Sequence, residues 1–280
     1  MLNLLKKFGL IFLVLLVILG SYYWRAQRPL PASGSRLSIG GVSAEILFFE
    51  VGDLIKRGPD RIIALRFLEN VEFRPYHYKE SGLDGPRIVE EWAKHLKSPL
   101  VFNAGQFDED FEHIGWLKRE DQFISQRFAS AWKGLLVSGQ NQSEIFDLEK
   151  VDQAAHQRFP HALQSMMLID EKGTLRVRDT ALNACRTVIA QDRQGRMLLL
   201  LTEGAITLGD MGRWLAASAL QIKYAMNLDG GIESQLALRA EGLKISVYGQ
   251  YGTGATVFDA RPGEIRYPLP AVLALVPTTK

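Results

Sequence analysis

The stretch 226–234, Met-Asn-Leu-Asp-Gly-Gly-Ile-Glu-Ser, is the segment from which the fold and the site are worked out. The apolar residues 224–226 lead into its polar part, and a β-strand is predicted over 224–228. Because side chains alternate between the two faces of a strand, we expect Asn227 and Asp229 on one face and Leu228 on the other. The stretch therefore predicts a strand that delivers an amide and a carboxylate together at its end.

Two glycines, Gly230 and Gly231, follow Asp229 directly. Glycine permits a positive φ and a close approach of the backbone, so the amides of these residues can point at a ligand oxygen or an anion. Ser234 then brings a hydroxyl to the start of the next predicted strand. An Asp-Gly hairpin turn, in which Asp229 bonds only its own backbone, explains the pattern equally well. The spacing alone leaves both interpretations open.

Short runs rich in apolar and β-branched residues recur on both sides of this stretch. The turn pairs Lys172-Gly173 and Gln194-Gly195 each separate two such runs, which is typical of β-hairpins. Strands are predicted over residues 44–51, 61–67, 99–103, 134–138, 162–170, 174–177, 186–192, 197–202, 224–228, 234–239, 244–248 and 271–276.

Helical patterns occur in three stretches, 87–97, 151–159 and 207–220. In the last of these, Thr207 with Asp210 three residues later resembles a capping box. Strands predominate and the helices intervene irregularly. We therefore expect an α+β fold, with a mixed or antiparallel twisted sheet and a few packed helices, preceded by one N-terminal transmembrane helix.

The expected transmembrane helix covers residues 8–24, which carry no charge, follow Lys6 and Lys7, and end in three aromatic residues. This length is at the short end of what spans a bilayer, and the aromatic residues stand where an interfacial belt would lie. A cleaved signal peptide is the alternative, but it would need a small-x-small site, and none follows the run. The pattern favours an uncleaved anchor.

Three parts of the chain follow from this pattern: an anchor or signal peptide over 1–28, a linker over 29–35, and a domain over 36–280. The basic residues before the apolar run keep that end inside the cell. The domain is therefore expected outside the cytoplasm, either on the periplasmic face of a bacterial inner membrane or secreted.

The net charge of +2 originates in the N-terminal segment. Lys6, Lys7, Arg25 and Arg28 flank the apolar run, and the rest of the chain has slightly more acids than lysines and arginines. Phosphate binding needs a basic surface, so we expect no nucleic-acid partner. The single cysteine excludes an intrachain disulfide framework and any multi-cysteine metal site.

A second polar group ends the predicted strand 99–103, where Asn103 is followed closely by Gly105. An amide at a strand end beside a glycine suits a sugar hydroxyl and is equally common in a plain turn. The acids at 108–110 lack the spacing of a calcium loop, which favours a solvated loop over a metal site. A divalent cation held by Asp229 and these acids stays open.

Polar residues also interrupt two apolar strands. Arg186 opens the predicted strand 186–192, and a buried guanidinium needs a carboxylate or a phosphate. It is therefore a phosphate ligand or a structural partner of an acid such as Asp229. Gln164 and Ser165 lie inside the strand 162–170, where they must be hydrogen-bonded. They form a structural pair or one wall of a site.

Taken in order, these motifs resemble the phosphodiester glycosidase domain family, which includes the lysosomal uncovering enzyme and exported bacterial members linked to exopolysaccharide production. The resemblance covers residues 100–276. The sequence departs from the family pattern at Ile232-Glu233, where the family has Gly or Ala and then Ser, and at Met166-Met167, where it has Gly-Pro. The matching motifs are 101–105 (VFNAG), 163–165 (LQS), 186–187 (RT) and 227–231 (NLDGG) followed by Ser234.

The resemblance implies hydrolysis of a sugar-1-phosphodiester at the anomeric C–O bond, which frees the sugar and leaves a phosphomonoester. It implies Asp229 as nucleophile or base, Glu233 as a second carboxylate, and Arg186 with the Gly230 and Gly231 amides as stabilisers of the phosphate. No cofactor is assigned. The other expected substrate-binding residues are Asn103, Gly105, Gln164, Ser165, Thr187, Asn227 and Ser234.

A protein of a different class fits the same sequence, namely a non-catalytic glycan-binding or assembly module in exopolysaccharide production. The anchor and the Ile232-Glu233 departure favour it. In both cases the expected partners are a glycan or sugar phosphate and, through the N-terminal helix, the membrane. Protein partners are not identified by the sequence.

Overall fold

A computed structural model of the chain describes residues 30–252 and 265–277. The chain divides into two units, Met1–Ala32 and Ser33–Lys280, and the fold described below is that of the second unit. The predicted N-terminal membrane helix lies outside the described residues. Among those that are described, no helix has the length and apolar character needed to cross a membrane.

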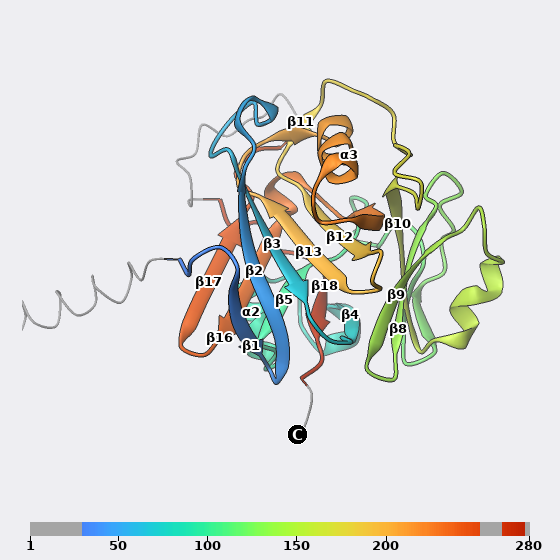
Figure 1. Ribbon diagram of the computed structural model, residues 1–280. Helices are drawn as coiled ribbons and strands as arrows, with labels where there is room; N and C mark the ends of the chain where they lie inside the picture. The colour runs from blue at the N-terminus through green and yellow to red at the C-terminus, as the bar shows by residue number, and fades with distance from the viewer. Residues whose placement is uncertain (1–29, 253–264, 278–280) are drawn as a thin grey trace, which may run out of the picture. The chain divides into compact units, whose positions relative to one another are not determined.

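The larger of two main sheets has eleven strands (Figure 1). Nine strands form a continuous path, and β8 (Gly134–Gly139) pairs with one of them, β10, and with β9 (Gln142–Asp147). The path runs β1 (Ser35–Ile39), β2 (Val42–Glu50), β3 (Arg61–Phe67), β13 (Met197–Thr202), β12 (Thr187–Asp192), β15 (Ile222–Asn227), β10 (His161–Ile169), β6 (Leu117–Arg119) and β7 (Gln122–Ser125).

The smaller main sheet has five strands, and a separate pair joins β11 (Asn183–Ala184) to β14 (Ile206–Thr207). Every strand pairing recorded for the described residues is antiparallel, which confirms the antiparallel form of the predicted sheet and leaves no mixed sheet among them. The five-stranded order is β17 (Leu243–Tyr248), β16 (Gln235–Ala240), β5 (Leu100–Asn103), β18 (Ala271–Leu275) and β4 (Phe73–His77).

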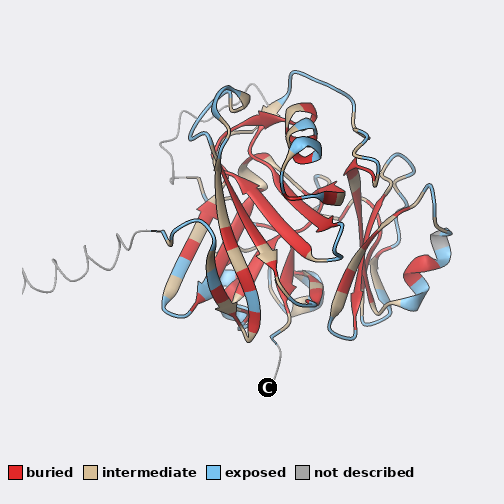
Figure 2. Ribbon diagram, in the orientation of Figure 1, coloured by how far each residue is buried: buried red, intermediate tan, exposed pale blue. Residues whose placement is uncertain are grey.

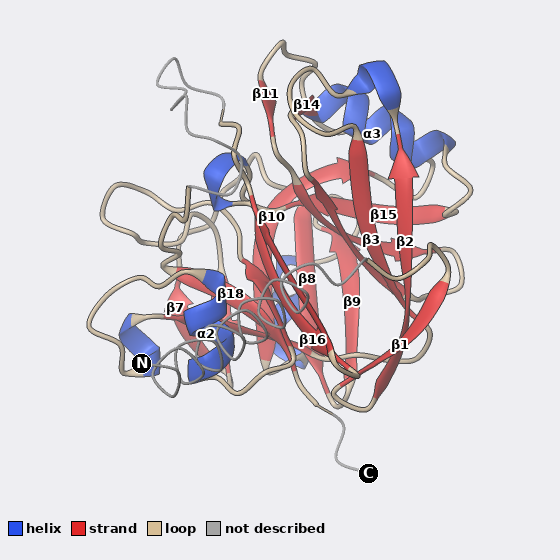
Figure 3. Cartoon of the chain, turned by 90° about the vertical axis from the view of Figure 1, so that its left-hand side faces the viewer, coloured by secondary structure: helices blue, strands red, loops and turns tan. Residues whose placement is uncertain are grey.

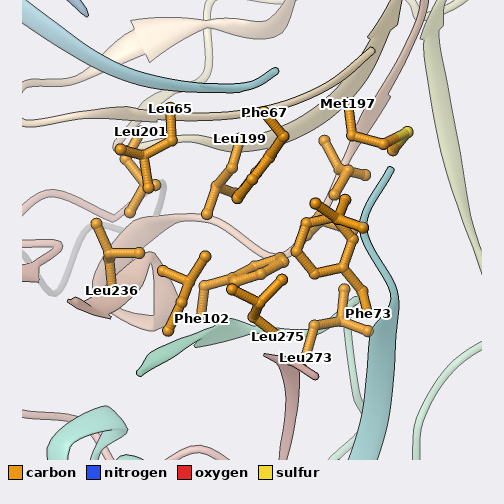
Figure 4. Packing of buried hydrophobic residues seen from close by; sticks show 14 of the residues in the cluster. Leu65, Phe67, Phe73, Phe102, Met197, Leu199, Leu201, Leu236, Leu273 and Leu275 are labelled. Atoms are coloured by element: carbon orange, nitrogen blue, oxygen red, sulfur yellow. The ribbon is translucent and has the colours of Figure 1, made fainter. Parts of the chain in front are cut away.

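The main hydrophobic core lies between the two sheets. Because side chains alternate along a strand, Ile63 and Leu65 of β3 point into this core, while Ile62 and Ala64 belong to a second core on the opposite face. In Figure 4, side chains of β3 and β13 face side chains of the smaller sheet: Leu65, Phe67, Leu199 and Leu201 on one side, and Phe73, Phe102, Leu236, Leu273 and Leu275 on the other.

One helix covers the outer face of each sheet. α3 (Leu208–Ala217) packs Met211 and Leu215 on the larger sheet, and α2 (Val89–His95) packs Trp92 on the smaller one. The strands of both sheets lie between these helices (Figure 3). The inner strands are almost wholly buried, whereas α3 turns exposed residues outward (Figure 2). The α+β prediction is confirmed for the described residues.

Two predicted elements are wrong. Residues 174–177 form no strand but a single bridge between Ile169 and Leu175. The turn does form, but Arg176 then pairs with Asp147, and the chain leaves the sheet. The predicted helix 151–159 is a 3-10 helix, η3 (Gln153–Arg158); the others in the described residues are η1 (Gly52–Leu54), η2 (Lys79–Ser81) and η4 (Gly231–Glu233).

Candidate active site

The connection from β15 to β16 carries the chain from the larger sheet to the smaller one, and it contains Asp229 and η4. The end of β15 lies beside the start of β12, where Asn227 is opposite Val188. Likewise, the start of β16 lies beside the end of β5, where Leu236 is opposite Phe102. Strand ends from both sheets therefore meet around this one connection.

A cavity of about 270 Å³ opens at this meeting point. Its volume suits a ligand of roughly monosaccharide size, slightly below the range of about 300–1,000 Å³ that is common for small-molecule sites. The described residues that line it are Gln106, Phe107, Ile114, Ala184, Arg186, Asp229, Gly230, Gly231, Glu233 and Gly252.

Asp229 and Glu233 bring two carboxyl groups to this cavity. Burial raises the pKa of Asp229 to about 8, and the negative charge of Glu233 contributes in the same direction. The pKa of Glu233 is raised as well, again by burial. Two half-buried acids in one cavity resist ionising together. Near neutral pH, Asp229 is therefore the acid that keeps a proton.

Arg186 supplies the positive charge in the cavity wall, and it is only 6% exposed. Its Nε donates to the Ile206 carbonyl at 3.0 Å and its Nη2 to the Leu182 carbonyl at 2.8 Å. Burial lowers its pKa to about 10, so it stays cationic at neutral pH. Among the described residues it forms no ion pair, and three of its five N–H donors are left for an anion.

The prediction that the Gly230 and Gly231 amides lie bare is wrong. The Gly230 amide donates to Asp229 Oδ1 at 2.9 Å, and the Gly231 amide donates to the Cys185 carbonyl at 2.8 Å. A Cβ on Gly230 would lie 2.7 Å from that same carbonyl, and Gly231 has a φ of +73°. The glycines therefore allow close packing against Cys185, and their amides already have hydrogen-bond partners within the chain.

Asn103 does not line the cavity and is 1% exposed. Its Nδ2 donates to the Asp229 carbonyl at 2.8 Å. Its Oδ1 accepts from the Thr187 hydroxyl at 2.8 Å and from the Gln235 amide at 3.1 Å. Thr187 has one hydroxyl proton and gives it to Asn103, so in the 2.7 Å contact between Thr187 and Ser234 the donor is Ser234. This buried chain holds the Asp229 backbone.

Other predicted contacts also lie behind the cavity wall. All four hydrogen-bonding positions of the Gln164 amide are used, on Trp116, Ala129 and Trp132. Ser165 donates to the Asn227 carbonyl at 2.6 Å. Of the twelve predicted site residues, the cavity lining includes Asp229, Arg186, Glu233, Gly230 and Gly231; it does not include Asn103, Gly105, Gln164, Ser165, Thr187, Asn227 or Ser234.

The strand-alternation argument for the end of β15 also needs correction. Asn227 is 1% exposed and its Oδ1 has no hydrogen-bond partner among the described residues, whereas Asp229 lies beyond the strand and faces the cavity. The two side chains are separated because β15 ends at Asn227, so alternation no longer applies to Asp229.

Sequence reasoning did not assign several lining residues. Gln106 and Phe107 directly follow the Asn103–Gly105 motif, and this proximity is a signal that could have identified them. Ile114 and Ala184 carry no chemical signal, since their contribution is shape alone. The described residues contain no group of three or more His, Cys, Asp or Glu side chains that could hold a metal ion.

A carboxyl pair and a buried guanidinium around a monosaccharide-sized cavity are compatible with a glycosidase-type hydrolase. The chain belongs to the phosphodiester glycosidase family, whose sequence model matches residues 100–272. No curated protein matches the chain.

Two of the solved structures that are similar to this chain illustrate the shared fold. The crystal structure of a hypothetical protein from Synechocystis superposes with a TM-score of 0.58 at 14% identity, over 84% of this chain and 62% of that one. The zebrafish N-acetylglucosamine-1-phosphodiester α-N-acetylglucosaminidase catalytic domain, auto-inhibited by its pro-peptide, gives 0.55 at 15% identity, over 86% and 80%. The chain thus spans less than two thirds of the Synechocystis protein.

Proposed function

We propose that this chain is an exported, membrane-tethered hydrolase that cleaves the glycosidic C–O bond of a sugar-1-phosphodiester in envelope or extracellular glycans. The observation that carries the proposal is the meeting of Asp229, Glu233 and Arg186 around one cavity. Family membership supports the reaction class. The uncharged run over 8–24 supports the tether and the location outside the cytoplasm.

In the proposed reaction, the sugar occupies the cavity and its phosphate lies against Arg186, whose free donors offset the negative charge. The C1–O bond breaks, and its electron pair goes to the phosphate oxygen. A water oxygen forms the new bond to C1 and loses a proton to Glu233. The departing phosphate oxygen receives the proton held by Asp229. The products are the free sugar and a phosphomonoester.

Assigning the acid to Asp229 differs from the expected role of nucleophile or base. The reason is its raised pKa, which keeps it protonated near neutrality, while Glu233 is the better candidate for the ionised partner. A phosphate ester leaves readily, so a weak acid suffices at this step. The two carboxyl groups then exchange one proton in each catalytic cycle.

The sugar named for the zebrafish relative supports N-acetylglucosamine as the first one to test. The full-length chain in detergent is incubated with an aryl ester of N-acetylglucosamine-1-phosphate, and free sugar and aryl phosphate are measured. We expect equal amounts of both with the parent chain and at least a hundredfold less with Asp229→Asn. Asp53→Asn, an exposed acid in η1, is the matched control. Unchanged turnover in Asp229→Asn would refute the assignment.

The second candidate is a non-catalytic glycan-binding or assembly module. Glu233 favours it, since this carboxyl stands where the family has a serine and places a second acid beside the phosphate position. Glycan binding without turnover, unchanged by Asp229→Asn, identifies this alternative. Loss of binding and turnover together in that variant excludes it.

A further inference from the structure

A second cavity, of about 750 Å³, shares one wall with the candidate active site. Phe107 lines both cavities, so the two cavities adjoin at this residue. The described residues lining the second cavity are Phe107, Asp108, Glu109, Asp110, Phe111 and Tyr267. It combines aromatic rings with carboxylates.

Three aromatic rings form its apolar surface. The Phe107 and Tyr267 rings are nearly parallel, with an interplanar angle of 17° and centroids 6.4 Å apart. Phe111 is tilted against Phe107, with centroids 5.9 Å apart. The pKa of Tyr267 is raised by burial and then by the charges of Glu233 and Asp229, so this ring also lies close to the carboxyl pair of the first cavity.

The loop that presents two of these rings is held in place before any ligand arrives. Phe107 bridges to His113, and the Asp108 Oδ1 accepts from the Asp110 amide at 3.1 Å and from the Glu112 amide at 3.0 Å. His77 Nε2 donates to the Phe111 carbonyl at 2.9 Å. Phe111 has a φ of +62°, a left-handed backbone conformation that is unfavourable for a bulky residue. The surrounding hydrogen bonds therefore hold the strained Phe111 backbone, and with it the Phe111 ring, beside the cavity.

Charge decides which ligand suits this surface. Asp108 pairs with Arg127, but Glu109 and Asp110 are exposed and form no ion pair with the described residues. None of the described lining residues is a lysine or an arginine. Aromatic faces beside carboxylates attract organic ammonium groups and repel anions. The neighbouring cavity has the opposite charge preference, because the Arg186 guanidinium attracts anions and repels cations.

We propose that the second cavity binds an ammonium-bearing aglycone, so that the preferred substrate is a zwitterionic sugar-1-phosphodiester with its phosphate on Arg186 and its cation among Phe107, Phe111, Tyr267 and the acids 108–110. The assignment of the sugar phosphate to the first cavity and of the aglycone to the second rests on the proposed function. Binding of the cation itself does not require turnover.

The test compares two ligands of equal shape. Choline phosphate and 3,3-dimethylbutyl phosphate differ only in the charged nitrogen, and calorimetry measures their binding to the full-length chain. We expect choline phosphate to bind about tenfold more tightly, as a partly desolvated cation–π contact predicts. The double variant Glu109→Gln/Asp110→Asn and the variant Phe107→Leu should each remove most of this difference. Glu50→Gln/Asp53→Asn removes two exposed acids elsewhere and should retain it.

Equal affinity for the two ligands in the parent chain overturns the proposal, and so does a preference that survives in all variants. A kinetic comparison uses the choline and 3,3-dimethylbutyl esters of N-acetylglucosamine-1-phosphate. Faster cleavage of the choline ester supports the subsite, and equal cleavage of both overturns it. Absence of all turnover with the charge preference intact contradicts the proposed function alone.

Discussion

The Asn103 side chain donates a 2.8 Å hydrogen bond to the backbone carbonyl of Asp229, across 126 positions of sequence. Asn103 ends β5 of the smaller sheet, and Asp229 follows β15 of the larger one. The amide therefore joins the two sheets at the point where the chain crosses between them. Its position behind the cavity wall makes it a positioning residue for the carboxyl group that faces the ligand.

The first prediction concerns this bond. Asn103→Leu keeps the branched shape of the side chain but leaves the Asp229 carbonyl and the Gln235 amide without their partner, which should cost about 2–3 kcal/mol of unfolding free energy. Turnover should fall in kcat more than KM rises, because the carboxyl moves while the cavity persists. Denaturant unfolding and steady-state kinetics measure the two effects.

Ser98→Ala is the control for that prediction. Ser98 is also buried, and its hydroxyl, with one proton to donate, lies 2.9 Å from the Leu100 carbonyl and 3.0 Å from the Leu275 carbonyl of the smaller sheet. It should lower stability without changing kcat. Equal kinetic effects of the two variants would show that Asn103 has no positioning effect.

The second prediction concerns the guanidinium. Arg186→Lys keeps a positive charge but cannot hold the Ile206 and Leu182 carbonyls and an anion at once, since one ammonium replaces a planar fork. We expect kcat/KM for the aryl phosphodiester to fall by about 10²–10³-fold. Arg213→Lys, on the exposed side of α3, should leave it unchanged. A loss below threefold in Arg186→Lys would contradict phosphate binding by Arg186.

The positions of many strands along the chain can be predicted from residue patterns, because apolar runs bounded by turn residues are local features. The predicted strand 61–67 coincides with β3, and the predicted cap of α3 is confirmed by the 2.9 Å bond from the Asp210 amide to Thr207 Oγ1. β4 has no such signal, since Pro75 interrupts its apolar pattern; this edge strand tolerates the missing donor.

The candidate site is harder to predict because its geometry depends on contacts between distant strands. The sequence places Asn103, Gln164 and Arg186 at strand ends or among apolar neighbours, but each has the residue type of either a ligand contact or a buried structural bond. Only the tertiary packing shows which residues contact the cavity and which form buried structural bonds. It gives the two amides backbone partners and leaves part of the guanidinium facing the cavity.

The third prediction links Asp229 to stability. The pKa of Asp229 is about 8 in the folded chain and near 3.8 when unfolded. Between these values the folded state keeps a proton that the unfolded state has lost, so this residue lowers stability as pH rises from about 4 to 8. The Asp229→Asn variant does not lose stability in this way, because an asparagine does not ionise. Its melting temperature relative to the parent should therefore rise steadily from about pH 4 to pH 8. Thermal unfolding at pH 4, 6 and 8 measures it.

Asp53→Asn serves as the control for this pH series, since Asp53 is an exposed acid in η1. The difference in melting temperature between Asp53→Asn and the parent chain should stay nearly constant with pH. If the difference in melting temperature between Asp229→Asn and the parent chain does not grow with pH, Asp229 ionises normally in the folded chain.

The fourth prediction isolates the interaction between the two carboxyl groups. The charge of Glu233 contributes to the raised pKa of Asp229, so Glu233→Gln should lower that pKa while burial keeps it above the ordinary value. Carbon-13 NMR of the Asp229 carboxyl, followed against pH in both chains, measures the shift without requiring turnover. Glu203→Gln is a control with an acid that pairs with Arg61 and does not line the cavity. An unchanged Asp229 titration in Glu233→Gln would show that the two acids do not share a proton, and the assignment of acid to one and base to the other would lose its electrostatic basis.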